Sequence, residues 1–207
     1  KPVEVERLTI HVAQASLLSQ VTEGIRRGVA TAEATVLVRD LCNHPANVMT
    51  PTRIVQEAKA VAKEPGVKLK VLEQKDMEQL GMGALLGVAK GSHEPPKFII
   101  LEYKGAKAKK GDPPVVMVGK TITFDTGGIS LKPAENMEHM KADMTGGAEV
   151  LATMRAAARL KLPVHLVSIL PVAAARALGL DPIQACSIVA VGVSPRALET
   201  TPDAGSG

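Results

Sequence analysis

Residues 118–143, VGKTITFDTGGISLKPAENMEHMKAD, limit the possible folds of this chain more than any other segment. Lys120 and Asp125 lie at the two ends of a short apolar strand, and a Gly-Gly pair then permits a tight reversal of the backbone. Lys132 and Asp143 follow, the latter at the start of a predicted helix. Charged side chains are costly to bury unless they are paired or bind a ligand. The segment therefore predicts most of a site for two metal ions.

Each of these residues also has a simpler interpretation. A lysine at the end of a strand, such as Lys120, is usually solvated. Asp125 precedes Thr-Gly-Gly and could serve only to cap a turn. Asp143 could cap the helix that it begins. The apolar approach to Asp125 places it at the exit of a central strand, where α/β proteins gather their sites, so the pattern as a whole favours ligation.

Two glycine-containing patterns resemble nucleotide-binding motifs but do not fit them. Residues 119–121 (GKT) imitate the end of a phosphate-binding loop, yet Pro114 stands where its first glycine should lie. Gly81, Gly83 and Gly87 miss the dinucleotide-binding spacing by one residue. A turn or packing role is therefore predicted for these glycines.

The composition argues against nucleic acid as the main ligand. The net charge is only +4, the pI is about 9.1, and the aromatic residues are limited to Phe98, Tyr103 and Phe124. Single-stranded nucleic acids usually stack on aromatic platforms, which this chain lacks. Cys42 and Cys186 are too few for a disulfide framework and too isolated for a thiolate zinc site, so a reducing, cytoplasmic location is expected.

Apolar periodicity predicts alternating strands and helices, which is typical of an α/β sheet. Strands are predicted at residues 1–12, 67–72, 83–88, 98–103, 115–118 and 164–170, and helices at 22–41, from Pro51 onwards, at 75–80 and at 143–160. The apolar residues 164–175 include His165, Ser168 and Pro171 and fall short of the roughly 20 residues that span a bilayer, so no membrane contact is predicted.

The motif VGKTITFDTGGISLKP, followed by MKADM and a helix of small residues, resembles the signature of the leucyl aminopeptidase family, dimetal exopeptidases that remove N-terminal residues from peptides. Residues 43–51 (NHPANVMTP) and 101–105 (LEYKG) support the resemblance, which runs from about residue 22 to about residue 172. It implies a mixed sheet flanked by helices, like the start of the family's catalytic domain. The implied division is 1–20 as the remnant of an N-terminal domain with its linker, 21–172 as part of the catalytic domain, and 173–207 as a divergent or altered segment.

The resemblance also implies roles for individual residues. Asp125 would bridge two divalent metal ions, zinc or manganese or else magnesium or cobalt, and Lys120 and Asp143 would complete one of them. Lys120 would then be a neutral amine shielded from solvent. Lys132 would be the catalytic residue, contacting the substrate carbonyl and stabilising its developing negative charge. Asp143 would also receive the substrate's terminal amine, and Met140 would line the pocket for the first side chain.

The sequence departs from the family pattern after about residue 172. Where the family has N-T-D-A-E-G-R, this chain reads TPDAGS over residues 201–206, so Asp203 is a further candidate metal ligand, but no glutamate follows Ala204 and Ser206 replaces the arginine. Three interpretations compete: a fragment of a longer protein, an end altered by a frameshift, and a diverged paralogue that lost catalysis. A truncated or altered chain is favoured.

The function expected from the resemblance is a metal-dependent aminopeptidase acting on peptides with leucine-like N-terminal residues, assembled as a homohexamer. The alternative is a noncatalytic scaffold or binding subunit derived from that family, with DNA as a ligand known among some relatives. Metal stoichiometry separates the two. Two tightly bound ions with peptide hydrolysis support the enzyme, whereas one loosely bound ion without hydrolysis supports the alternative.

Overall fold

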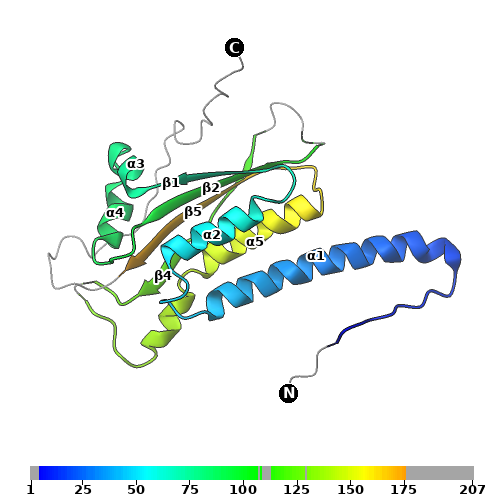
Figure 1. The fold of residues 1–207 in the computed structure, drawn as a ribbon, viewed down its shortest axis with the longest axis horizontal. Helices are drawn as coiled ribbons and strands as arrows, with labels where there is room; N and C mark the ends of the chain where they lie inside the picture. Colours follow the sequence, from blue (N-terminus) through cyan, green and yellow to red (C-terminus); the bar gives the residue numbers. More distant parts are fainter. Residues whose placement is uncertain (1–4, 107, 109–112, 129, 176–207) are drawn as a thin grey trace, which may run out of the picture.

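The computed structural model describes residues 5–106, 108, 113–128 and 130–175 (Figure 1). These residues form a five-stranded mixed sheet with the order β1-β2-β5-β3, in which β4 also pairs with β5. The strands are β1 (Val67–Leu72), β2 (Lys97–Lys104), β3 (Val115–Val118), β4 (Thr121–Asp125) and β5 (His165–Ala175). The pairs β1/β2 and β2/β5 are antiparallel, whereas β3 and β4 run parallel to β5. The predicted α/β fold with a mixed sheet is thus confirmed.

Strand β5 lies at the centre of this sheet and is buried along almost its whole length. Its first half pairs with β3 through residues 166–169, and its second half pairs with β4 from Val172 to Ala175. Strands β3 and β4 therefore lie one after the other along the same edge of β5. Such a strand needs apolar residues on both faces, which explains why the sequence HLVSILPVAAA is nearly continuously apolar.

Helices cover both faces of the sheet. Alternate residues of β5, such as Leu166 and Leu170, pack in a core with α2 (Pro51–Val61) and α5 (Thr145–Arg159). The residues between them, such as Val167 and Ile169, pack with α3 (Gln74–Gln79) and α4 (Gly83–Ala89). The remaining helical elements are η1 (Ala15–Leu17), the long α1 (Leu18–Asn43), which lies along α5 outside the sheet, and η2 (Met137–Ala142). No helix in the described part of the chain is long and apolar enough to span a bilayer.

Local sequence signals explain where α2 begins. Thr50 is its N-cap, and the side chain of Thr50 accepts a hydrogen bond from the backbone N–H of Arg53. Pro51 occupies the first turn, where its missing N–H costs nothing. The predicted start of a helix at Pro51 is confirmed.

Two predicted strands are wrong. Residues 83–88 form helix α4, whose buried residues Leu85 and Ala89 are four positions apart, the spacing of one helix face. A short apolar run does not distinguish a strand from a buried helix by periodicity alone. Residues 5–12, the described part of the predicted strand 1–12, form no strand either. Val5 and Leu8 are each 81% exposed, so no neighbouring strand among the described residues stabilises that conformation.

Candidate metal centre

The predicted site residues lie in four pieces of chain, at the two ends of β4 and between β4 and α5. Asp125 is the last residue of β4, and Lys120 lies in the connection between β3 and β4. Lys132 follows the turn after β4, and Asp143 lies between the end of η2 and the start of α5. In Figure 1 the chain after β4 leaves the sheet, passes through the short helix η2 and returns to enter α5.

One carboxylate oxygen of Asp143 forms an ion pair, and the other has no hydrogen-bond partner among the described residues. Its Oδ1 lies 2.9 Å from Nζ of Lys120. Its Oδ2 is buried and receives no hydrogen bond from any described residue. A buried polar atom without a partner costs about 1–3 kcal/mol, so such an atom calls for an explanation, and a water molecule or a bound ion is one. Asp143 does not cap α5, whose N-cap is Met144, so this simpler interpretation of Asp143 is wrong.

Asp125 has both carboxylate oxygens occupied. Its Oδ2 lies 2.5 Å from Nζ of Lys132, and its Oδ1 accepts a hydrogen bond of 2.9 Å from the backbone N–H of Gly127. Burial acts to raise the pKa of Asp125, but these two hydrogen bonds and the charges of Lys132 and Lys120 outweigh it and hold that pKa below its ordinary value. Asp125 is therefore an anion at neutral pH. Asp125 therefore caps the turn through Gly127, as the simpler interpretation expected, and it also pairs with Lys132.

The turn after β4 returns Lys132 to Asp125. Gly127 has a φ of +90°, and a Cβ added there would lie 2.4 Å from the carbonyl oxygen of Ser130. Only glycine fits this conformation without strain. Gly127 forms an isolated bridge with Leu131, and the N–H of Lys132 donates to the carbonyl of Thr126 over 3.0 Å. The Thr-Gly-Gly sequence thus determines where Lys132 lies.

Close packing of glycines fixes Lys120 and Asp143 relative to each other. A Cβ on Gly119 would lie 2.3 Å from the carbonyl oxygen of Gly146, so the connection between β3 and β4 touches the first turn of α5. The N–H of Gly147 donates to the carbonyl of Lys120 over 2.8 Å. The motif around Asp143 did not predict this role for Gly146 and Gly147. The signal was a second Gly-Gly pair directly after the Asp143 motif.

The two ion pairs belong to one cluster. The charge of Lys120 contributes to lowering the pKa of Asp125, and the N–H of Ile122 in β4 donates to the carbonyl of Asp143 over 3.3 Å. Met140, the expected pocket residue, has its Sδ 3.2 Å from Nζ of Lys132. The structure therefore brings together the five predicted site residues that it describes, whereas Asp203 lies outside the described residues.

Two features differ from the expectation. The side chain of Lys120 is 63% exposed and is therefore not shielded from solvent, because Lys120 lies on a connection outside the sheet. Within residues 5–175, excluding the gaps given above, no group of three or more His, Cys, Asp or Glu side chains could hold a metal ion. The described part of the site offers two carboxylates and an amine. This donor set, which includes the unpartnered Oδ2 of Asp143, is compatible with several kinds of divalent metal ion.

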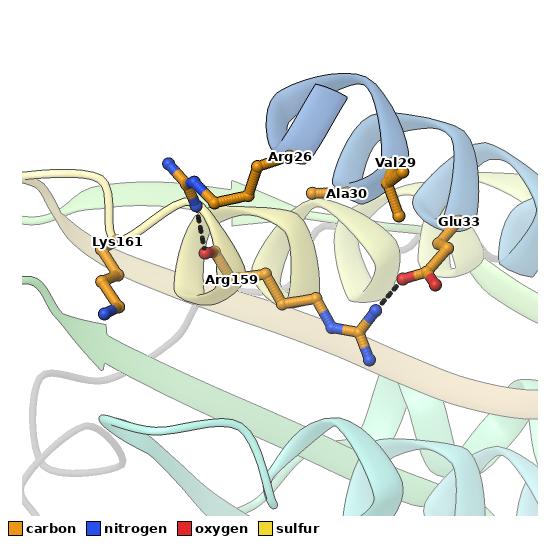
Figure 2. A pocket seen from close by; sticks show the side chains of 6 residues that line it. All are labelled: Arg26, Val29, Ala30, Glu33, Arg159 and Lys161. Carbon is orange, nitrogen blue, oxygen red and sulfur yellow. Dashed lines mark hydrogen bonds and ion pairs between the residues drawn. The ribbon is translucent and has the colours of Figure 1, made fainter. Parts of the chain in front are cut away.

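A groove lies elsewhere, between α1 and α5 (Figure 2). Arg159, the last residue of α5, and Lys161, which follows that helix, line it together with Arg26, Ala30 and Glu33 of α1. Val29 of α1 completes its lining. Asp143 lies at the opposite end of α5, so this groove is not part of the candidate metal centre.

Comparison with known proteins agrees with this geometry. Residues 36–179 match the catalytic domain of the cytosol aminopeptidase family. A probable cytosol aminopeptidase of Nitrosococcus oceani is 51% identical over 166 residues, which cover 80% of this chain and 33% of that protein. One from Azoarcus is 56% identical over 147 residues, which cover 71% of this chain and 29% of that protein. The chain spans about a third of the length of these curated relatives.

Solved structures give the same result. The bottromycin maturation enzyme BotP in complex with Mn has a TM-score of 0.67 and 40% identity, covering 74% of this chain and 32% of its own. The cytosol aminopeptidase of Coxiella burnetii has a TM-score of 0.68 and 35% identity, with the same coverage. Sequence motif, sheet and site geometry agree with these similarities, and the chain therefore belongs to the cytosol aminopeptidase family, of whose catalytic domain it carries a part.

Proposed function

We propose that this chain carries the metal-binding part of an aminopeptidase that hydrolyses peptides at leucine-like N-terminal residues. The observation that carries the proposal is the buried Oδ2 of Asp143, which lacks a partner among the described residues and belongs to the same cluster as the anionic Asp125. Two carboxylates in one cluster, one of them at the end of a parallel strand, suit a divalent cation.

Lys120, Asp125 and Asp143 are the residues that would hold the metal ions, with Asp203 as a further candidate. Two divalent ions, zinc or manganese or else magnesium or cobalt, would polarise the peptide carbonyl and make a water molecule nucleophilic at neutral pH. Lys120 would act as a ligand only as an uncharged amine, so binding at this residue releases a proton. That release is itself measurable.

The other residues of the cluster would act on the substrate. The ammonium of Lys132 would stabilise the negative charge that develops on the carbonyl oxygen of the peptide. Met140 is half-buried beside that ammonium, which suits it to line the pocket for the first side chain of the peptide. Asp143 would receive the terminal amine of the peptide, which is a cation that its carboxylate attracts.

Relatives support this assignment. One is described in complex with Mn, and leucyl aminopeptidases of Trypanosoma brucei and Leishmania major are described in complex with bestatin or actinonin. The names of the curated relatives support a cytosolic location, and membership of the family supports a homohexamer. These statements extend to this chain as parts of the same proposal.

Metal titration of the 207-residue chain tests the proposal. After treatment with a chelator, calorimetric titration with Mn²⁺ or Zn²⁺ should give two tightly bound ions per chain, and hydrolysis of leucyl p-nitroanilide should depend on the added metal. One loosely bound ion without hydrolysis would instead support the noncatalytic binding subunit. No binding of either ion would contradict both.

A further inference from the structure

Lys141 lies in the chain between two residues of the proposed site, Met140 and Asp143, but contacts a different element. Its Nζ donates a hydrogen bond of 3.0 Å to the backbone carbonyl of Asn43, the last residue of α1. Oδ2 of Asp143, only two residues further along the chain, has no partner among the described residues. The ammonium of Lys141 therefore joins η2 to α1 and does not occupy that oxygen.

The C-terminal end of α1 is a favourable place for a cation. The last carbonyl groups of an α-helix lack partners within the helix and carry a partial negative charge. The last turn of α1 contains no basic residue, and Asp40 adds a further negative charge there. The ammonium of Lys141 satisfies one of these carbonyl groups from outside the helix. The bond therefore stabilises the contact between α1 and η2.

The end of α1 also contacts the chain directly after Asp143. Sγ of Cys42 lies 3.4 Å from Oγ1 of Thr145 and 3.8 Å from Sδ of Met144. Met144 is fully buried in the core that the sheet forms with α2 and α5. The chain after Asp143 is thus held by this core, whereas the bond of Lys141 holds the chain before it.

The short helix η2 depends on such contacts for its position. None of its six residues is buried, and the hydrogen bonds of a 3-10 helix have poorer geometry than those of an α-helix. In Figure 1 the C-terminal end of α1 lies beside this short helix between β4 and α5. An element with little buried apolar surface opens locally at a low cost in free energy. Loss of a polar contact should therefore displace η2 before it affects the core.

We propose that Lys141 is a positioning residue of the metal centre, a role that rests on the function proposed for the same site. By its bond to the end of α1, Lys141 holds η2 in place. Asp143 follows η2 directly, and Met140 lies within it with Sδ 3.2 Å from Nζ of Lys132. Lys141 thus acts on the metal ion and the substrate only through these neighbours.

The charge and the positioning role of Lys141 have opposite effects on metal binding. An ammonium repels a divalent cation, so removal of the charge alone would strengthen the binding of Mn²⁺. If Lys141 instead holds Asp143 in place, its removal weakens binding because the carboxylate is no longer fixed where the ion binds. The sign of the change in affinity therefore separates the two effects.

Calorimetric titration of the metal-free 207-residue chain with Mn²⁺ measures this sign. Lys141→Met should weaken binding by about 3- to 10-fold, and Lys141→Arg, which keeps a charged donor, should restore most of the loss. Lys104→Met is the matched control because it removes the same charge elsewhere. Lys104 pairs with the first residue of β5, whereas Asp125 of the site pairs with the last. The control should bind Mn²⁺ like the wild type.

Hydrogen exchange of the metal-free chain, followed by NMR, tests the positioning without a metal ion. The N–H of Asp143 donates to the carbonyl of Met140, and the N–H of Ile122 donates to the carbonyl of Asp143. Both amides should exchange about 3- to 10-fold faster in Lys141→Met than in the wild type. The N–H of Gly105, which donates to the carbonyl of Val164, should be unaffected.

Four results would overturn the role of Lys141. They are unchanged or tighter Mn²⁺ binding in Lys141→Met, equal weakening in the Lys104→Met control, no recovery in Lys141→Arg, and unchanged exchange of the Asp143 and Ile122 amides. Failure of the wild type to bind Mn²⁺ or Zn²⁺ would contradict the proposed function instead. The exchange rates would then still decide whether Lys141 holds Asp143 in position.

Discussion

At the residue scale, the two aspartates of the site differ in how many of their carboxylate oxygens have a hydrogen-bond partner. Asp125 is saturated by Lys132 and by the N–H of Gly127, whereas Asp143 has one buried oxygen without a partner among the described residues. A cation that enters the site can therefore bind Asp143 without breaking a contact of its Oδ2. To bind Asp125 through Oδ2, the same cation must displace the ammonium of Lys132.

Substitution of Asp125 and Lys132 separates metal binding from catalysis. Asp125→Ala should abolish metal binding because it removes the proposed bridging carboxylate. Lys132→Ala should leave metal binding nearly intact and lower kcat by a factor of about 100 or more, since it removes stabilisation of transition-state charge. Calorimetry measures the first effect and hydrolysis of leucyl p-nitroanilide the second. Equal loss of metal in both variants would contradict these roles.

Glu102 should make the stability of the chain depend on pH. Its Oε1 lies 2.8 Å from Nε2 of His165 and 3.0 Å from Nζ of Lys104. Burial acts to raise the pKa of Glu102, but these contacts outweigh it and hold that pKa below the ordinary value of 4.5. Because the pKa is depressed in the folded state, the stabilisation is present above pH 4.5 and is lost as the pH falls through the folded-state pKa.

The variant Glu102→Gln should therefore be less stable than the wild type at pH 7, by about 1 kcal/mol. The difference should shrink as the pH is lowered below 4.5 and through the depressed folded-state pKa of Glu102. Urea denaturation at a series of pH values measures it. Glu149→Gln, at an exposed position of α5, serves as the control and should match the wild type throughout. A difference that stays constant with pH would rule out the charge of Glu102 as its origin.

At the scale of elements, the contact between the β3–β4 connection and the start of α5 holds the site together. Gly119, Gly146 and Gly147 allow the two backbones to approach, and this contact fixes Lys120 close to Asp143. Replacing any of these glycines should therefore disturb the site, although glycine itself carries no functional side chain.

The variant Gly147→Ala should be strongly destabilised. The added Cβ would lie 2.0 Å from Oγ1 of the buried Thr121, and the backbone on both sides would have to separate. We expect a loss of about 2 kcal/mol or more in the free energy of unfolding, with weaker metal binding. Gly87→Ala in α4 is the control, because its Cβ would meet nothing within 4 Å and should stabilise the helix by about 0.5–1 kcal/mol. Thermal or urea unfolding measures the stability of both variants. Equal stability of Gly147→Ala and Gly87→Ala would contradict the packing role of Gly147.

The sequence predicted most elements but not how they pair. The predicted strands 67–72 and 115–118 coincide with β1 and β3, because β-branched residues between turn residues mark them clearly. Residues 83–88 gave no such signal, since GALLGV is apolar without a period. The pattern placed Asp125 at the exit of a strand, where the structure also has it. The contacts of Gly146 and Gly147 could not be predicted, because they depend on an approach between segments distant in the chain.

At the scale of the whole molecule, this chain spans about a third of the length of its known relatives and contains the candidate metal centre. The described residues bury a core on each face of the sheet, one with α2 and α5 and one with α3 and α4. Some large apolar side chains remain exposed on α1 and β3, and others lie near the N-terminus and in the connections between elements.

The central strand of the sheet is the last of the described strands to be synthesised. Strands β2, β3 and β4 all pair with β5, whereas before β5 only β1 and β2 can pair with each other. While the chain emerges from the ribosome, β3 and β4 must therefore wait for the template that arrives after residue 165. Nascent chains stalled before β5 leaves the exit tunnel should be digested by protease beyond the antiparallel pair β1/β2, and chains stalled after it should resist.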